Sequence, residues 1–231
     1  MNETYAQRMR VTFATDDTVK WVGHLDFARA WERAIRRAGL PLAYSQGFNA
    51  QARIHFAAAL PVSFTGQAEV VDVFLNEELA PEEFLARLQA ALPTRIRLTG
   101  AEPVPRALPS LQSALVGADY RVEVAPPPEG AGLAERLEGF MARAEAWRER
   151  QRGDKPPVRY DLRPLVTDAR HLGTGELGEL FEVRMRSEPG ATGRPDELLA
   201  ELGLADAPRR IVRTALRFGP DTATDGLRPS G

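Results

Sequence analysis

The 231-residue sequence contains no cysteine, only three histidines, and only two lysines among its 30 basic residues. The lack of cysteine excludes disulfides, thiolate-bound zinc, iron–sulfur clusters and a cysteine nucleophile. His24, His55 and His171 lack the spacing of a histidine metal site, so we expect no metal centre. No apolar run approaches the ~20 residues of a membrane helix, and the first residues lack the apolar core of a secretory signal. We therefore expect a cytoplasmic protein with no membrane contact.

The remaining 28 basic residues are arginines, yet the formal net charge is −2. Arginine binds phosphate through two hydrogen bonds and stacks on bases, whereas lysine acts as a point charge. A GC-rich or thermophilic genome would produce the same bias, so the count alone does not indicate nucleic-acid binding. The net charge argues against a protein that is basic over its whole surface.

The order of periodic segments predicts two domains of the same topology. Residues 8–103 form the N-terminal domain, residues 104–117 a proline-rich connector, residues 118–218 the C-terminal domain, and residues 219–231 a disordered tail. The expected strands cover residues 10–14, 52–58, 68–75, 95–102, 119–124, 158–165, 180–187 and 209–218. The expected helices cover residues 24–40, 81–92, 133–151 and 194–203. We therefore predict an α+β fold of two tandem ferredoxin-like βαββαβ sandwiches with antiparallel sheets.

In such a sandwich the helices cover one face of each sheet and leave the other open. Side chains alternate along a strand, so the neighbours of the residues that face the helices point to the open face; we call these neighbours the outward set. The outward set of the second half holds eight arginines and three acids: Arg121, Glu123, Arg159, Asp161, Arg163, Glu182, Arg184, Arg186, Arg209, Arg213 and Arg217, together with Ile211. The outward set of the first half is Arg10, Arg53, His55, Arg95 and Arg97. These residues are either a nucleic-acid surface or solvated cross-strand pairs, or the two open faces pack on each other.

The first helix carries a further basic element. Its apolar stripe includes Trp31, and four arginines lie opposite that stripe: Arg29, Arg33, Arg36 and Arg37. Such a stripe is either a solvated face or part of a binding surface.

The helix runs into residues 42–56, LAYSQGFNAQARIHF. Gly47 provides a turn, and Phe48 and Asn49 follow at its tip, where we expect Arg53, Arg36 and Arg37 to lie beside them. An aromatic ring, an amide and arginines form a contact set for single-stranded RNA. The alternative is that Phe48 fills the core and Asn49 caps the turn.

Several motifs resemble a known family. They are the His24-Leu25-Asp26 helix start, the helix end from Arg36 to Pro41, the Ser45-x-Gly47-Phe48-Asn49 turn, the Ala57-x-x-Leu60-Pro61 strand end, and the segments 161–166 and 193–216. With them the sequence resembles the uncharacterised radical-SAM-linked proteins over about residues 8–218. The resemblance implies an accessory module of a radical SAM system that acts on RNA or the translation apparatus. Where that family commonly has Pro-His-Pro-Lys, this chain has residues 50–53, AQAR, so no role of that histidine carries over.

The leading interpretation is a non-catalytic module that binds RNA, either tRNA or rRNA, and presents it to a radical SAM enzyme in trans. That partner would hold the iron–sulfur cluster and S-adenosylmethionine, since this chain has no cysteine and we expect no cofactor in it. The expected RNA-binding residues are Arg29, Arg33, Arg36, Arg37, Phe48, Asn49, Arg53, Arg184, Arg186 and Arg213.

Two other classes of function stay open. One is a metal-independent RNA endonuclease with His24 and His55 as general acid and base, although the simplest role of His24 is structural, beside Asp26. The other is a protein-docking module whose open sheets bind the partner enzyme.

Overall fold

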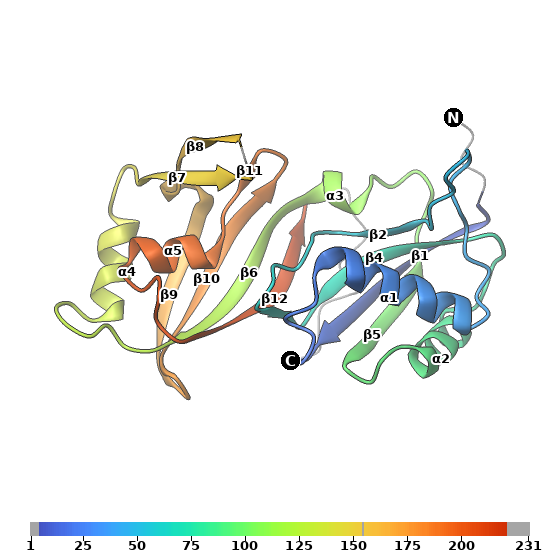
Figure 1. Cartoon of the computed structure of the whole chain (residues 1–231), viewed down its shortest axis with the longest axis horizontal. Helices are drawn as coiled ribbons and strands as arrows, with labels where there is room; N and C mark the ends of the chain where they lie inside the picture. Colours follow the sequence, from blue (N-terminus) through green and yellow to red (C-terminus); the bar gives the residue numbers. More distant parts are fainter. Residues whose placement is uncertain (1–4, 154, 221–231) are drawn as a thin grey trace. The chain divides into compact units, whose positions relative to one another are not determined.

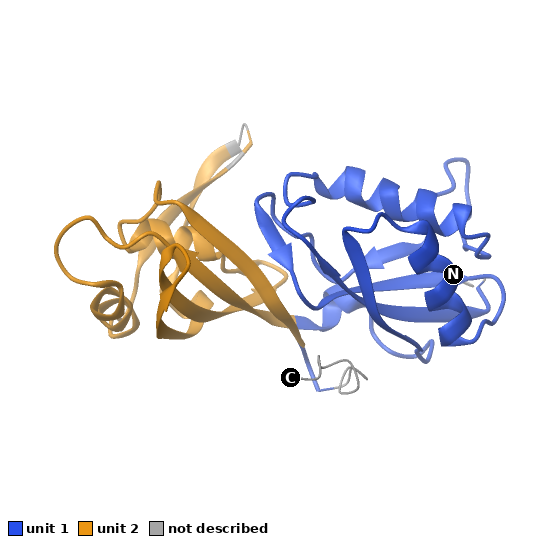
Figure 2. Cartoon of the chain, turned by 90° about the horizontal axis from the view of Figure 1, so that it is seen from below, with its two compact units in different colours: residues 1–115, 218–231 blue, residues 116–217 orange. Residues whose placement is uncertain are grey.

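The computed structural model describes residues 5–153 and 155–220, so most of the expected disordered tail lies outside the described residues. The chain divides into two compact units, shown in separate colours in Figure 2. Unit 1 takes residues 1–115 and 218–231, and unit 2 takes residues 116–217. The division falls inside the predicted connector.

Unit 1 is a ferredoxin-like sandwich. Its elements are β1 (Gln7–Thr15), α1 (His24–Arg37), β2 (Ile54–Phe56), β3 (Phe64–Gly66), β4 (Glu69–Leu75), α2 (Pro81–Ala91), β5 (Ile96–Pro103) and α3 (Leu111–Ala114). The antiparallel sheet has the strand order β2-β4-β1-β5, which is the order of a βαββαβ unit with β4 as its third strand. Helices α1 and α2 lie together on one face of this sheet (Figure 1).

The core of unit 1 forms where the apolar stripe of α1 meets the sheet. Trp31 is fully buried, and its ring centroid lies 4.9 Å from that of Phe13 in β1. Arg33, on the opposite side of the helix, is exposed. The predicted helix phase is therefore confirmed. Gly39, with φ of 63°, ends the helix in the left-handed conformation that glycine adopts without strain.

The other face of this sheet is covered, and the prediction of an open face is wrong. The connector packs there: Val104 and Leu111 are buried, and the backbone N–H of Val104 donates to the Arg8 carbonyl at 2.9 Å. The Arg8 guanidinium donates to the carbonyls of Leu108 and Pro109 at 2.8 and 2.9 Å. The connector is therefore part of unit 1 and is not a free linker.

Unit 2 repeats the topology with an insertion. Its elements are β6 (Leu115–Val124), α4 (Leu133–Met141), β7 (Trp147–Arg152), β8 (Lys155–Asp161), the 3-10 turn η1 (Arg163–Leu165), β9 (Val166–Gly175), β10 (Gly178–Glu188), β11 (Ala191–Thr192), α5 (Pro195–Glu201) and β12 (Arg209–Phe218). The path β12-β6-β10, with β9 paired to the far edge of β10, again gives the ferredoxin-like order.

Two predicted elements of unit 2 are wrong. The helix expected over 133–151 ends at Met141, whose carbonyl accepts hydrogen bonds from Arg163 at 2.9 and 3.2 Å. The strand expected over 158–165 is not in the main sheet, because β8 pairs with β7 in a separate hairpin. Arg150 and Arg148 tie this hairpin to α5 through ion pairs of 2.6 Å to Glu197 and 2.8 Å to Glu201.

Candidate functional site

Phe48 lies at the tip of a closed, exposed loop in unit 1. The loop spans residues 45–51, and its ends are joined because the N–H of Ser45 donates to the Gln51 carbonyl at 2.8 Å and the N–H of Gln51 donates to Ser45 Oγ at 2.9 Å. Gly47 has φ of 127°, a left-handed value that a side chain would strain. Phe48 is 105% exposed, so it does not fill the core. Asn49 beside it is also exposed.

Tyr44, at the base of this loop, connects it to α1. Its hydroxyl donates to Glu32 of α1 at 3.4 Å. Burial and the Glu32 carboxylate raise the pKa of Tyr44, while the positive charge of Arg36 acts against them. The loop base therefore lies beside the middle and end of α1.

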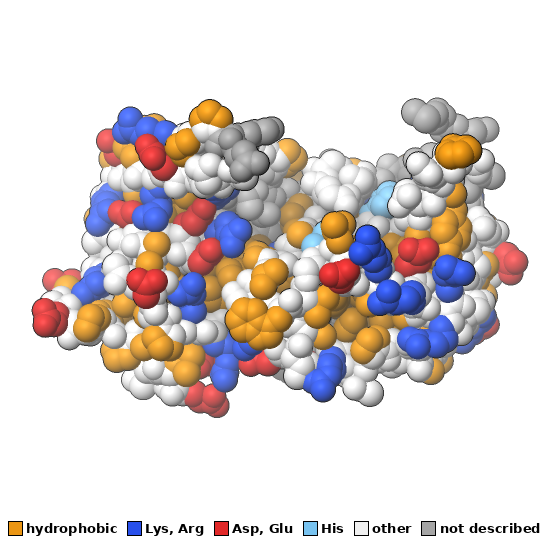
Figure 3. Space-filling view, viewed as in Figure 1, with side chains coloured by type: hydrophobic (Ala, Val, Ile, Leu, Met, Phe, Trp, Pro, Cys, Tyr) orange, Lys and Arg blue, Asp and Glu red, His pale blue; other side chains and the backbone are white. Residues whose placement is uncertain are grey.

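The exposed side of α1 is basic. Lys and Arg side chains gather over this helix in Figure 3. Arg29 pairs with Asp26 at 3.2 Å, and Arg37 donates to the Ala91 carbonyl at the end of α2 at 2.6 Å. Among the residues that the structure describes, Arg33 and Arg36 have neither a hydrogen bond nor an ion pair. Two cations are therefore available on the helix that Tyr44, at the base of the Phe48 loop, contacts through Glu32.

Arg53 does not belong to this surface, contrary to the prediction. It is 8% exposed on the covered side of the sheet, where its guanidinium lies 4.5 Å from the Phe74 ring and 4.8 Å from the Tyr5 ring. Arg10 is fully buried on the same side, paired with Asp72 at 3.0 Å. Of the basic outward residues expected for the first half, Arg10 and Arg53 are therefore buried, whereas Arg95 and Arg97 are exposed.

In unit 2 the open face carries alternating charges rather than a basic patch. Adjacent strands place Arg170, Glu182 and Arg121 in one row, and Asp168, Arg184 and Asp119 in the next row. Glu182 pairs with Arg121 at 3.0 Å and with Arg170 at 3.3 Å. Each arginine in these two rows therefore has an acidic neighbour on the adjacent strand. The alternative of solvated cross-strand pairs describes this face, and a basic RNA surface does not.

The predicted RNA-binding residues of unit 2 are all engaged or buried. Arg184 pairs with Asp119 at 2.9 Å, and Arg186 pairs with Glu188 at 3.1 Å. Burial opposes ionisation of Asp119, but hydrogen bonds from Arg217 and Arg184 outweigh it and hold the pKa of Asp119 below its ordinary value. Arg213 is only 3% exposed.

The burial of Arg213 shows that the predicted phase of β12 is wrong over its first half. Ile211 is buried with Arg213, whereas Arg210 pairs with Glu123 at 3.6 Å and Thr214 lines the same charged face. Arg217 returns to that face by pairing with Asp119. The alternation therefore changes between Thr214 and Arg217, as a strand irregularity produces.

His24 and His55, the candidate acid and base, lie on opposite faces of the unit 1 sheet. His24 begins α1 and stands against Phe56 on the helix side, with ring centroids 5.5 Å apart. His55 precedes Phe56 in β2 and stands against Phe74 on the connector side at 4.9 Å. The Asp26 carboxylate accepts a hydrogen bond from Arg29 at 3.2 Å, and among the described residues none joins it to His24.

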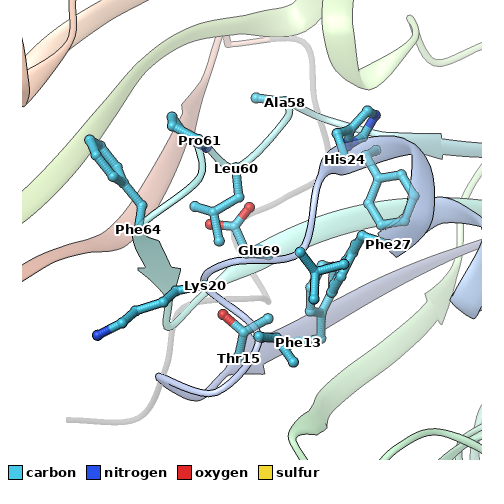
Figure 4. A pocket seen from close by; sticks show the side chains of 13 residues that line it. Phe13, Thr15, Lys20, His24, Phe27, Ala58, Leu60, Pro61, Phe64 and Glu69 are labelled. Atoms are coloured by element: carbon cyan, nitrogen blue, oxygen red, sulfur yellow. The ribbon is translucent and has the colours of Figure 1, made fainter.

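A small pocket that sequence reasoning missed opens at the start of α1. Figure 4 shows His24 and Phe27 on one side, Leu60, Pro61 and Phe64 on the other, and the Glu69 carboxylate between them. Its cavity measures about 20 Å³, room for about one water or one methyl group. The pocket combines two loops far apart in sequence, 16–23 and 57–63. The only feature of the sequence that could have indicated these loops is the presence of apolar residues, such as Trp21 and Val62, in segments without helical or strand periodicity.

Within residues 5–153 and 155–220 we find no group of three or more histidine or acidic side chains placed to hold a metal ion. No helix of the described part of the chain is long and apolar enough to cross a membrane.

One protein-family model matches residues 8–194, most of the chain, and it describes an uncharacterised protein conserved in bacteria, DUF2344. The chain belongs to the DUF2344 family. No curated protein matches this DUF2344 chain. Among solved structures it is similar to an unknown protein from Galdieria sulphuraria, with 12% identity, coverage of 90% of this chain and 99% of the other, and a TM-score of 0.26. It is also similar to a putative glycine cleavage system transcriptional repressor, with 11% identity, coverage of 92% of this chain and 98% of the other, and a TM-score of 0.25. At these TM-scores neither structure bears on function.

Proposed function

We propose that this DUF2344 protein is a non-catalytic accessory module that binds single-stranded RNA, from a tRNA or an rRNA, and presents it to a radical SAM enzyme in trans. The observation that carries the RNA part is the fully exposed Phe48 at the tip of a closed loop, whose base contacts the helix α1 that carries the exposed Arg33 and Arg36. The radical SAM part rests on the motif resemblance. Because this chain has no cysteine, the iron–sulfur cluster and S-adenosylmethionine would belong to the partner.

In this proposal each exposed group has one task. Phe48 stacks on a base, which stabilises binding for any sequence because every base has a π-face. Asn49 hydrogen-bonds the edge of that base. Arg33 and Arg36 neutralise phosphates along α1, where they lie three residues, about 4.5 Å, apart along the helix axis. Of the RNA-binding residues expected from the sequence, the proposal keeps those on the exposed face of α1 and in the Phe48 loop and omits those on the two sheets.

The other candidate activities have less structural support. An endonuclease that uses His24 and His55 together would need both imidazoles on one side of the phosphate, and they lie on opposite faces of the sheet. RNA binding across the open face of unit 2 would require breaking ion pairs such as Arg184–Asp119, which compete with phosphate for the same guanidinium groups.

The test is the salt dependence of binding to a short single-stranded RNA, measured by fluorescence anisotropy. The Phe48→Ala variant should lose about 1–3 kcal/mol of binding energy at an unchanged slope of log affinity against log salt. Arg33→Ala combined with Arg36→Ala should shallow that slope by about 0.7 for each phosphate contact. The matched control is Arg184→Ala, which removes a cation that is already paired and should change neither quantity.

The proposal fails if the unmodified protein binds no such RNA at low salt. It also fails if Arg184→Ala weakens binding as much as the double variant on α1, because unit 2 would then hold the RNA. Phe48 and Arg33 are exposed, so the variants should unfold at the same urea concentration as the unmodified protein and report on binding alone.

A further inference from the structure

We infer that two copies of this chain pair through β9, the edge strand of the unit 2 sheet, in an antiparallel register centred on Ala169. Among the residues that the structure describes, β9 pairs with β10 alone. No hydrogen bond within the described chain reaches the backbone of residues 167–175 outside that ladder. The outer N–H and C=O groups of this edge can therefore bond a further strand.

This edge presents one acid and one base, two residues apart. Asp168 is exposed and lies opposite Arg184 of β10, yet it has neither a hydrogen bond nor an ion pair among the described residues. Arg170 lines the same open face, is 72% exposed, and pairs with Glu182 on the inner side of the strand at 3.3 Å. A strand that binds here therefore meets a negative charge without a partner and a positive charge that is open on its outer side.

A second copy of the chain supplies the complementary pattern. A two-fold axis through Ala169 places Asp168 of each copy opposite Arg170 of the other copy. Side chains directly opposite in an antiparallel pair lie on the same face, with Cβ atoms about 4.5–5.5 Å apart, so opposite charges there attract. A one-residue slip would turn the side chains to the wrong face, and a two-residue slip would oppose Asp168 with itself or Arg170 with itself. The charges therefore select one register.

The same register extends the charge rows that already cross the sheet. Arg170 ends one row at the edge, and Asp168 ends the next row. Pairing about Ala169 joins the first row of one copy to the second row of the other. The joined row alternates in sign throughout: Arg121, Glu182 and Arg170, then Asp168, Arg184 and Asp119 of the second copy. The ion pair of Arg170 with Glu182 stays intact when the copies meet.

Two bulges limit the length of this pairing. The register between β9 and β10 shifts at Thr167 and at Leu172, so residues 168–171 form the regular part of the edge. Bulges at an edge strand restrict further pairing. A ladder this short stabilises a dimer weakly, and salt screens its exposed charges. We therefore expect a dimer that dissociates on dilution and at high salt.

The experiment is sedimentation velocity of the purified full-length protein, without RNA, over a range of protein concentrations. The dimer fraction should rise with concentration. Asp168→Arg and Arg170→Asp should each weaken dimerisation about tenfold or more, because two attractive pairs become two repulsive pairs. Mixed in equal amounts, the two variants should form a heterodimer, because opposite charges then face each other again.

The matched control is Arg121→Asp. Arg121 lies in the same row as Arg170 and pairs with the same Glu182, at 3.0 Å, but it is inside the sheet on β6. This variant should dimerise as the unmodified protein does. A second measurement is amide hydrogen exchange of residues 167–171, which should slow as the concentration of the unmodified protein rises. The substituted positions on β9 are exposed, so these variants should unfold at the same urea concentration as the unmodified protein.

Three results would overturn this inference. The first is a chain that is monomeric at every concentration, which would leave the edge to a strand of another protein. The second is a dimer that Asp168→Arg leaves unchanged, because another surface would then form it. The third is that the two variants form no heterodimer when mixed. Because no RNA is present, none of these results affects the RNA proposal.

Discussion

Asp72 is the shared partner of two buried arginines, and its replacement by alanine is the most informative perturbation of unit 1. The carboxylate accepts from Arg8 Nε at 2.8 Å and from Arg10 Nε at 3.0 Å. The side chains of Asp72, Arg8 and Arg10 are 1%, 4% and 0% exposed. The Asp72→Ala change therefore removes the carboxylate that both buried guanidinium groups hydrogen-bond.

The expected cost follows from this burial. Removing one partner of a buried ion pair destabilises a protein by about 3–5 kcal/mol, because the remaining charge stays desolvated. Exposed pairs are worth only about 0–1 kcal/mol, and Arg29–Asp26 of α1 in the same unit is of that kind. Asp72→Ala should therefore lower the free energy of unfolding of unit 1 several times more than Arg29→Ala.

A second substitution separates charge from packing. Adding Arg10→Met to Asp72→Ala removes the guanidinium that has no exposure, and it should restore part of the lost stability. Arg8 still has the carbonyls of Leu108 and Pro109 as acceptors, so it needs Asp72 less.

The assay is urea unfolding of unit 1 followed by the fluorescence of buried Trp31, with Trp21 and Trp147 replaced by phenylalanine. A loss for Asp72→Ala no larger than that for Arg29→Ala would show that the Arg8–Arg10–Asp72 network is hydrated. A double variant less stable than Asp72→Ala alone would show that Arg10 acts by packing and not by its charge.

Three further predictions concern other parts of the chain. Trp31→Ala should cost about 3–5 kcal/mol in denaturant unfolding, whereas Arg33→Ala on the exposed side should cost little; equal losses would contradict the helix phase. The pKa of Asp119 is lowered in the folded chain, so its contribution to stability is complete above about pH 4, the unfolded value, and is lost as pH falls through the folded value. Asp119→Asn should therefore reduce the loss of unfolding free energy between about pH 4 and lower pH, and an unchanged loss would refute this. Limited proteolysis should spare residues 108–115, which pack on unit 1, and early cleavage there would show that the connector is detached.

Local periodicity predicted the parts of the fold that depend on one segment. The apolar stripe around Trp31 repeats with the helical period, and the stripe determines which face of α1 is buried. The alternation around Val122 and Phe181 correctly placed the helix-facing side of β6 and β10. By contrast, β9 has polar side chains on much of its length and pairs only at the edge of β10, so its pattern resembles that of a loop.

The candidate site depended on contacts between segments, which alternation does not reveal. The alternation of side chains along a strand placed Arg10 and Arg53 on the side away from the helices. It could not show that the connector covers that side. One irregularity in β12 was enough to turn Arg213 inward. Phe48 was predicted at a loop tip because Gly47 has no side chain to strain the turn, and that position is confirmed by its exposure, whereas its RNA contact remains a prediction.

The most direct test of the RNA proposal is photo-crosslinking of the protein to RNA in its native host, followed by mass spectrometry of the crosslinked peptides. Crosslinks should concentrate on Phe48 and on peptides of α1 that contain Arg33 or Arg36. Crosslinks concentrated on the open face of unit 2, around Arg184, would contradict the account, because there each guanidinium already has a carboxylate partner.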